Sequence, residues 1–90
     1  MTSIQHGMRM MVAEHLSAGD PITRLEALTL YGVQNLPEQI RELRREGWNI
    51  KSRKVTFAES VRRVNQYAIY TPPKNLPIAE ILLSDYWLSK

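Results

Sequence analysis

The sequence predicts an α+β fold in which three helices precede a β-hairpin and a further helix follows it. Two short helices with capping signals are separated by a few residues around Gly32, as in a helix-turn-helix unit. Two segments rich in β-branched and aromatic residues follow Gly47. This order of elements is that of a winged helix-turn-helix domain.

Composition restricts the class of protein. A chain of 90 residues with 43% hydrophobic residues is long enough for one domain with a single modest core. The absence of cysteine excludes disulfides and thiolate metal sites. The N-terminal segment is interrupted by His6, Arg9 and Glu14, so we expect neither a signal peptide nor a membrane span, and we expect a cytoplasmic protein.

Positive charge is concentrated in the middle of the chain. The net charge is +3, but residues 36–71 alone contain eight basic and four acidic residues, which gives +4. Such a segment is either an ordinary solvated face or a surface that binds a polyanion. Charge alone does not separate the two readings.

The first helix is predicted over Ile4–Leu16, where apolar residues recur at helical spacing, and Gly19 and Pro21 end it. A capping box formed by Thr23 and Glu26 predicts the start of the second helix, which Gly32 ends.

The third helix is expected to begin at Asn35, whose side chain caps it while Glu38 reaches back. Pro37 fits the first turn because no helical partner is lost there. An apolar stripe along one side predicts the buried face, and Gly47 ends the helix.

Residues 48–57 and 63–71 are predicted to form the two antiparallel strands of a hairpin, with a polar break at residues 58–60. Residues 1–71 would thus form the winged helix-turn-helix domain. The tail, residues 72–90, is expected to form a helix from about Leu76, which would be apolar nearly all round. It would either pack across its own domain or form a homodimer contact through Ile78, Ile81, Leu82, Tyr86 and Trp87.

The third helix carries the side chains that we expect to contact DNA bases. With its apolar stripe turned inward, the outward residues are those that bind guanine, adenine and cytosine edges. They are Gln34, Glu38, Arg41 and Arg45. Contacts to the DNA backbone are expected from Thr23, Arg24, Arg44, Lys51, Arg53, Lys54, Arg62 and Arg63. The alternative for the basic hairpin is an edge whose charge prevents aggregation.

No arrangement of residues indicates catalysis, a cofactor or a metal site. His6 and His15 lie nine residues apart on different faces, the glycines are isolated, and no small-molecule ligand is evident. We therefore expect a protein that is not an enzyme.

The chain resembles a family of small winged helix-turn-helix proteins common in bacteriophages and prophages. The resemblance covers roughly residues 8–71 and implies DNA binding in a bacterial host cell. The residues that carry it are Ile22, Thr23, Glu26, Ala27, Leu28, Gly32, Ile40, Leu43, Arg44, Gly47, Ile50, Tyr67, Ala68 and Tyr70. A long basic hairpin turn and the apolar tail depart from the family pattern.

Two functions remain open at the level of sequence. The first is a sequence-specific double-stranded DNA-binding protein, which acts as a transcriptional regulator or as an architectural or recombination accessory factor. The alternative is a protein-protein interaction module that docks on host or phage machinery, because winged helices serve both purposes. The sequence leaves the operator, the regulatory role and the oligomeric state open.

Overall fold

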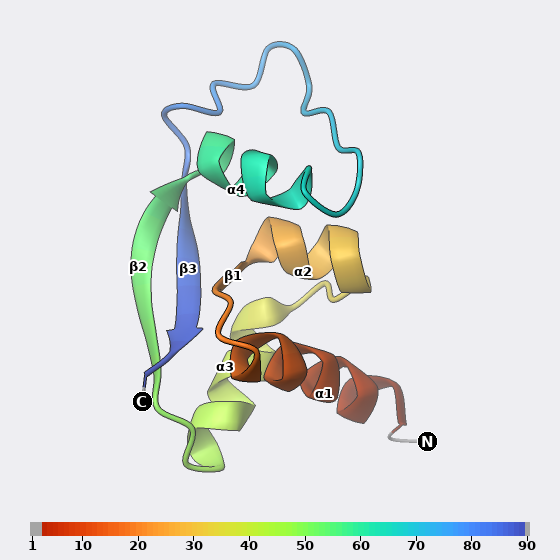
Figure 1. The fold of residues 1–90 in the computed structure, drawn as a ribbon, viewed down its shortest axis with the longest axis vertical. Helices are drawn as coiled ribbons and strands as arrows, with labels where there is room; N and C mark the ends of the chain where they lie inside the picture. Colours follow the sequence, from red (N-terminus) through yellow and green to blue (C-terminus); the bar gives the residue numbers. More distant parts are fainter. Residues whose placement is uncertain (1–2, 90) are drawn as a thin grey trace.

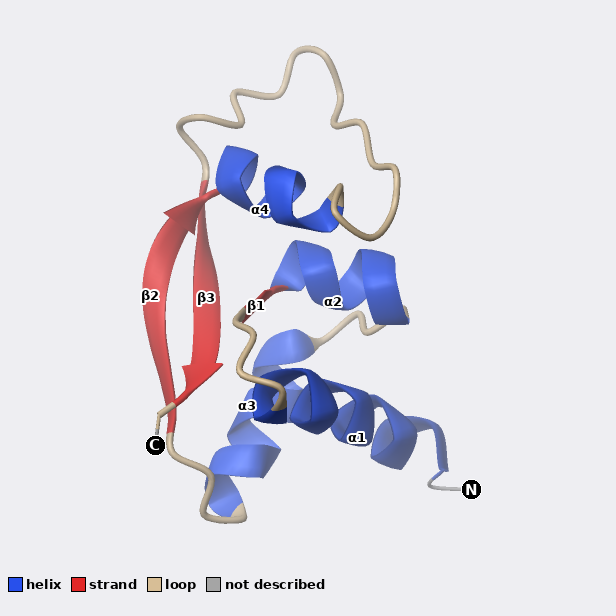
Figure 2. Ribbon diagram, in the orientation of Figure 1, coloured by secondary structure: helices blue, strands red, loops and turns tan. Residues whose placement is uncertain are grey.

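The computed structural model describes the backbone of residues 3–89 and the side chains of residues 7–89, so the side chain of His6 lies outside the described ones. Helices gather beside a three-stranded antiparallel sheet (Figures 1 and 2). In chain order the elements are α1 (Ser3–Ser17), β1 (Ile22–Thr23), α2 (Arg24–Tyr31), α3 (Leu36–Arg45), β2 (Ile50–Thr56), α4 (Phe57–Val64) and β3 (Leu82–Leu88). The three predicted N-terminal helices are confirmed.

The start and end of α2 follow the predicted capping pattern. The backbone N–H of Glu26 donates to the Thr23 hydroxyl at 3.3 Å, and the backbone N–H of Thr23 donates to Glu26 Oε1 at 2.9 Å. Gly32 adopts a left-handed φ of 69°, and its N–H donates to the Leu28 carbonyl at 2.9 Å. This turn directs the chain from α2 into α3.

The start of α3 differs from the prediction. The side chain of Asn35 makes no capping hydrogen bond, although Pro37 does lie in the first turn. At the other end Gly47 adopts φ 102°, and the Trp48 N–H donates to the Leu43 carbonyl at 3.0 Å. The chain thereby leaves α3 and enters β2.

The sheet has the order β1–β3–β2, so β3 is its central strand. It pairs antiparallel with β1 at Ile22↔Tyr86, and with β2 from Ile50↔Leu88 to Thr56↔Leu82. The tail therefore contributes the strand that joins the other two.

The predicted second strand of the hairpin, residues 63–71, is wrong: β2 is followed by α4 and then by a loop that leads to β3. The Thr56 hydroxyl caps this helix by accepting the Glu59 N–H at 3.1 Å. Ser60, Val61 and Val64 are its buried residues, at helical spacing. The polar residues 58–60, taken for a turn, form the first part of this helix.

The predicted C-terminal helix is also wrong, because Leu82–Leu88 is a strand. A segment that is apolar on all sides as a helix is equally suited to a strand with neighbours along both edges and side chains packed on both faces. Within the domain, Leu83, Tyr86 and Leu88 of this strand pack against the two hydrophobic clusters, whereas Leu82 is 58% exposed.

Side chains pack in two clusters. The larger lies between α1, α2, α3 and the sheet, and includes Leu16, Ile22 and Leu36, each at most 1% exposed. The smaller joins Leu25 of α2 to Val61 and Val64 of α4. Figure 1 shows α4 stacked on α2, which lies above α1. The segment inserted between β2 and β3 is thus fixed to the helix-turn-helix unit.

Candidate nucleic-acid interface

One face of α3 is open to solvent. Its opposite face buries Leu36, Ile40 and Leu43, each at most 2% exposed. The side chains of Arg41 and Arg45 are 63% and 67% exposed. The outward direction predicted for these two arginines is therefore correct, and Gln34 is exposed in the turn before α3.

Glutamates of the same helix neutralise both exposed arginines. Arg41 Nη2 lies 2.8 Å from Glu38 Oε2, and Arg45 Nη1 lies 2.9 Å from Glu42 Oε1. Exposed pairs of this kind contribute only about 0–1 kcal/mol. A nucleic acid can therefore replace the carboxylates as the partner of the arginines at small cost.

The acidic residues of α3 occupy one flank of the helix. Glu38, Glu42 and Glu46 are four residues apart and follow one line along the surface. Arg9 of α1 pairs with Glu46 at 3.4 Å, and the hollow beside Arg9 is lined by Glu38 and Glu42. The negative charge of this helix is therefore concentrated on the flank that faces Arg9.

Strand β2 carries positive charge with little compensation. Lys51, Arg53 and Lys54 are all exposed on this edge strand. Arg53 Nε lies 3.4 Å from Asp85 Oδ2, and the Lys54 ammonium donates to the Ser84 hydroxyl at 2.9 Å. This strand is thus more electropositive than α3.

Arg44 is exposed, but its guanidinium is bound within the protein. Its Nε and Nη2 donate to the Ile50 carbonyl at 3.0 and 2.8 Å, and its guanidinium carbon lies 5.9 Å from the centre of the Tyr86 ring. The side chain holds the end of α3 against the sheet, which directs its charged group toward protein atoms.

Two further residues predicted to contact the DNA backbone are turned inward. Thr23 is fully buried, and its hydroxyl lies 2.5 Å from that of Ser60. The Arg63 side chain is only 16% exposed and lies between Glu26 and Asp85. Thr23 has no exposed atoms to offer a phosphate, and the guanidinium of Arg63 is already bound by two carboxylates.

The environment of Arg63 keeps it charged. Desolvation opposes the charge, but hydrogen bonds to Asp85 and Glu26 outweigh it and raise the pKa of Arg63. The guanidinium donates to Asp85 at 2.7 and 3.1 Å and to Glu26 through Nε at 3.2 Å, with a second short contact to Glu26. It is a structural cation.

The remaining predicted backbone contacts are exposed. Arg24 is the first residue of α2 and faces solvent. The side chain of Arg62 in α4 is 72% exposed and pairs with Glu59 of the same helix. The prediction that Arg62 and Lys54 lie on the two arms of one hairpin is wrong, because residues 57–64 form a helix.

The sequence analysis missed helix α4 and the buried carboxylate of Asp85. Thr56 followed three residues later by Glu59 has the spacing that starts α2, and could have revealed α4. The buried position of Asp85 had no comparable signal, because its partners Arg63 and Arg53 lie 22 and 32 positions away in the sequence.

The helix-turn-helix unit of α2 and α3 is followed by β2 and β3, which pair in a three-stranded antiparallel sheet. This arrangement is that of a winged helix-turn-helix protein. Residues 7–72 match the family described as the winged helix-turn-helix domain, and the chain belongs to this family. Comparison with curated proteins and with solved structures finds no match. The family match ends before β3, so the central strand lies outside it.

Domains of this family are typically DNA-binding modules without enzymatic activity, and membership indicates that the protein binds DNA. Across the described residues, no helix has both the length and the hydropathy needed for a membrane span. Nor do three His, Asp or Glu side chains within that part of the chain come together as a metal site.

Proposed function

We propose that the protein binds double-stranded DNA sequence-specifically, with the open face of α3 in the major groove. Gln34, Arg41 and Arg45 are the residues that we assign to base edges, with Glu38 beside them as an acceptor for cytosine. The observation that carries the proposal is the pair of exposed arginines on α3, each paired with a half-buried glutamate of the same helix.

Contacts to the DNA backbone are assigned to the basic residues that remain exposed. Strand β2 contributes Lys51, Arg53 and Lys54, because it follows α3 directly and has few acidic neighbours. Arg24 at the start of α2 and Arg62 on α4 are the other candidates. Thr23 and Arg63 are removed from this set because their side chains lie inside the protein. Arg44 is removed although it is exposed, because its guanidinium binds the Ile50 carbonyl.

The test is fluorescence anisotropy with a duplex selected from a random library, titrated at several salt concentrations. Arg41→Ala should weaken binding to the selected duplex by about 1–3 kcal/mol and relax the preference for one base position. Lys74→Ala, at an exposed position in the loop before β3, is the matched control and should have little effect. Absence of binding at low salt, or equal losses for both variants, would contradict the proposal.

We further propose a regulatory or architectural role of the kind found in phages and prophages. A transcriptional regulator and a recombination accessory factor both need a small, sequence-specific DNA-binding domain. Footprinting on the DNA that flanks the gene separates them: protection over a promoter supports regulation, and protection over a recombination site supports the accessory role.

A protein-docking function is the second candidate, and one observation favours it. A groove of about 360 Å³ beside α2, α4 and β3 is lined largely by apolar side chains, among them Leu28, which is 50% exposed, Phe57 and Leu83. Arg24 and Gln34 complete its lining. Affinity capture with and without nuclease is the test. Partners retained after nuclease treatment support docking, and partners lost with the DNA support the first proposal.

The homodimer predicted from the tail has less support. Tyr86 packs on the main core, and the carbonyls of Ile78 and Ile81 accept the backbone N–H groups of Ala58 and Phe57 at 3.0 and 2.8 Å. Among the proposed dimer residues, Leu82 is the most open, at 58% exposed. Light scattering of the free protein and of its DNA complex measures the number of chains directly.

A further inference from the structure

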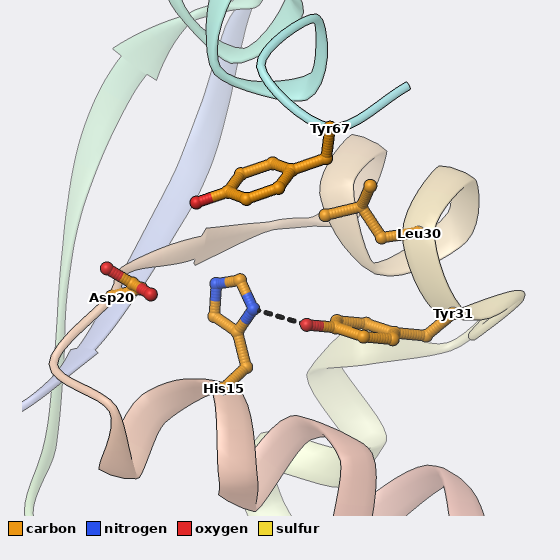
Figure 3. Close-up of a pocket in the computed structure, with 5 residues that line it drawn as sticks. All are labelled: His15, Asp20, Leu30, Tyr31 and Tyr67. Atoms are coloured by element: carbon orange, nitrogen blue, oxygen red, sulfur yellow. Dashed lines mark hydrogen bonds between the residues drawn. The ribbon is translucent and has the colours of Figure 1, made fainter. Parts of the chain in front are cut away.

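A hollow of about 270 Å³ lies on the side of the molecule where α1 and α2 end, under the turn that follows α4 (Figure 3). His15 reaches up from α1, Tyr31 lies at the end of α2, and Tyr67 covers them from above. Asp20 borders the opening, and Leu30 adds an apolar contact. The size is slightly below the range of about 300–1,000 Å³ usual for drug-sized ligands, so it suits a small molecule.

The walls of this hollow are held in place before any ligand binds. The Tyr31 hydroxyl lies 2.7 Å from His15 Nδ1, and His15 Nε2 donates to the Pro21 carbonyl at 2.9 Å. Both ring nitrogens of His15 are therefore engaged with protein groups. The two rings meet edge to face, with centroids 5.6 Å apart.

Tyr67 is positioned by its own turn, although its side chain is 65% exposed. Its backbone N–H donates to the Val64 carbonyl at 2.9 Å. The side-chain oxygen of Asn65 accepts the Tyr70 N–H at 3.0 Å, which closes the turn. An exposed aromatic ring on a fixed turn provides a preformed face for a ligand.

Asp20 is the charged residue among those that line this hollow. Within the described part of the chain, Asp20 forms no ion pair, so its carboxylate is free to meet a ligand. Burial, followed by the nearby Tyr67, Asp20, Glu26 and Glu14, raises the pKa of Tyr31. The site thus favours a positive guest in a protein whose net charge is +3.

An anion is not accommodated by the one arginine nearby. A second, smaller hollow shares His15, Asp20 and Tyr67 with the first and reaches Arg63. All three guanidinium nitrogens of Arg63 already donate to Glu26 or Asp85. Its charge is therefore matched within the protein.

We propose that this hollow, which we call the tyrosine pocket (His15, Asp20, Leu30, Tyr31 and Tyr67), binds a small organic ammonium ion. The faces of Tyr31 and Tyr67 supply the aromatic walls that attract a cation, and Asp20 supplies the opposite charge. The ligand would connect the turn after α4 to the ends of α1 and α2. DNA binding through α3 is not needed for this proposal.

The test uses choline and ethylammonium as probes, together with 3,3-dimethyl-1-butanol, which has the shape of choline without its charge. Titration followed by ¹H–¹⁵N NMR should show saturable shifts for residues of the tyrosine pocket with at least one ammonium probe. The neutral alcohol should bind at least tenfold more weakly. Equal binding of the alcohol, or no saturable shift with either ammonium ion, overturns the proposal.

Variants identify the groups responsible. Asp20→Asn removes the charge without changing the shape and should weaken binding at least fivefold, whereas Glu80→Gln, at an exposed loop position, should leave it unchanged. Tyr67→Leu should weaken binding by a similar factor, and Tyr67→Phe, which keeps the ring, should retain it. Wild-type affinity in both Asp20→Asn and Tyr67→Leu would show that the cation binds elsewhere and contradict the assignment.

Discussion

Arg63 of α4 and Asp85 of β3 form a two-point ion pair, in which Nη2 lies 2.7 Å from Oδ1 and Nη1 lies 3.1 Å from Oδ2. Asp85 is fully buried, and the same guanidinium also binds the buried carboxylate of Glu26 in α2. One side chain therefore connects α2, α4 and β3. Geometry with this many hydrogen bonds is what makes a buried charge tolerable.

Replacing this arginine should destabilise the domain strongly. Arg63→Met leaves the buried carboxylate of Glu26 without a cation and that of Asp85 with only the 3.4 Å contact to Arg53, so it should lower the free energy of unfolding by about 3–5 kcal/mol, measured by urea denaturation. Arg62→Met is the matched control: that side chain is 72% exposed, and the change should stay within about 0.5 kcal/mol. Similar small losses in both variants would show that the buried pair adds little.

The left-handed turn between α2 and α3 should also be sensitive to substitution. Gly32 has φ 69°, so Gly32→Ala should cost about 1–2 kcal/mol even though an added Cβ meets nothing within 4 Å. Gly7→Ala, within α1 and equally free of clashes, should instead stabilise the protein by about 0.5–1 kcal/mol. Thermal denaturation of both variants tests the opposite signs, and a neutral Gly32→Ala would contradict this reasoning.

Stability should fall at alkaline pH through Tyr31. Its pKa is raised above the ordinary 10.0, chiefly by burial, so the folded state retains the phenolic proton more strongly than the unfolded chain does. This contribution is complete below pH 10 and is lost as the pH rises through the raised pKa. Tyr31→Phe should cost about 1 kcal/mol at neutral pH and flatten the alkaline decline. An unchanged slope above pH 10 in that variant would assign the decline to other groups.

Removing an acidic partner on α3 should strengthen DNA binding if α3 enters the groove. Glu42→Gln frees Arg45 and removes a charge that repels phosphate, so affinity should rise about two- to fivefold, equivalent to about 0.4–1 kcal/mol. Glu80→Gln removes the same charge from an exposed loop position and should change affinity little. Anisotropy titrations at constant salt make the comparison, and a loss of affinity in Glu42→Gln would argue against the assigned surface.

The chain should not fold without its last strand. A truncation that ends at Pro72 keeps the full extent of the family match but removes β3, which leaves β1 and β2 unpaired. We expect a disordered NMR spectrum from this fragment, and a native-like one from a chain that ends at Ser89. A folded fragment would show that the helices alone sustain the domain.

The first half of the fold could be predicted from sequence because its signals are local. The capping box at Thr23, the left-handed Gly32 and the apolar stripe of α3 each act within a few residues, and all three are present. The same holds for the exposure of Arg41 and Arg45, which follows from helical periodicity once Ile40 and its neighbours are buried.

The second half depends on partners distant in the sequence. The choice of β3 over residues 63–71 as the neighbour of β2 is made by long-range pairing, which composition does not encode. The inward direction of Arg63 likewise depends on Asp85 and Glu26. The sequence predicts that this arginine contacts DNA, whereas in the structure it is paired with these two carboxylates. The exposure of the predicted DNA-contacting residues on α3 could therefore be predicted from sequence, whereas the direction of Arg63 beyond Thr56 could not.

The position of β3 between β1 and β2 has a consequence for synthesis of the protein. The edge strands β1 and β2 are synthesised before the central strand β3. Helix α4 and the loop after it lie between β2 and β3 in the sequence. The three-stranded sheet cannot close until β3 emerges, because the contacts it needs are among the most distant in the domain. Until then β1 and β2 lack the strand that pairs with both of them, and β2, with its three exposed basic side chains, is protected from pairing with other chains by its own charge.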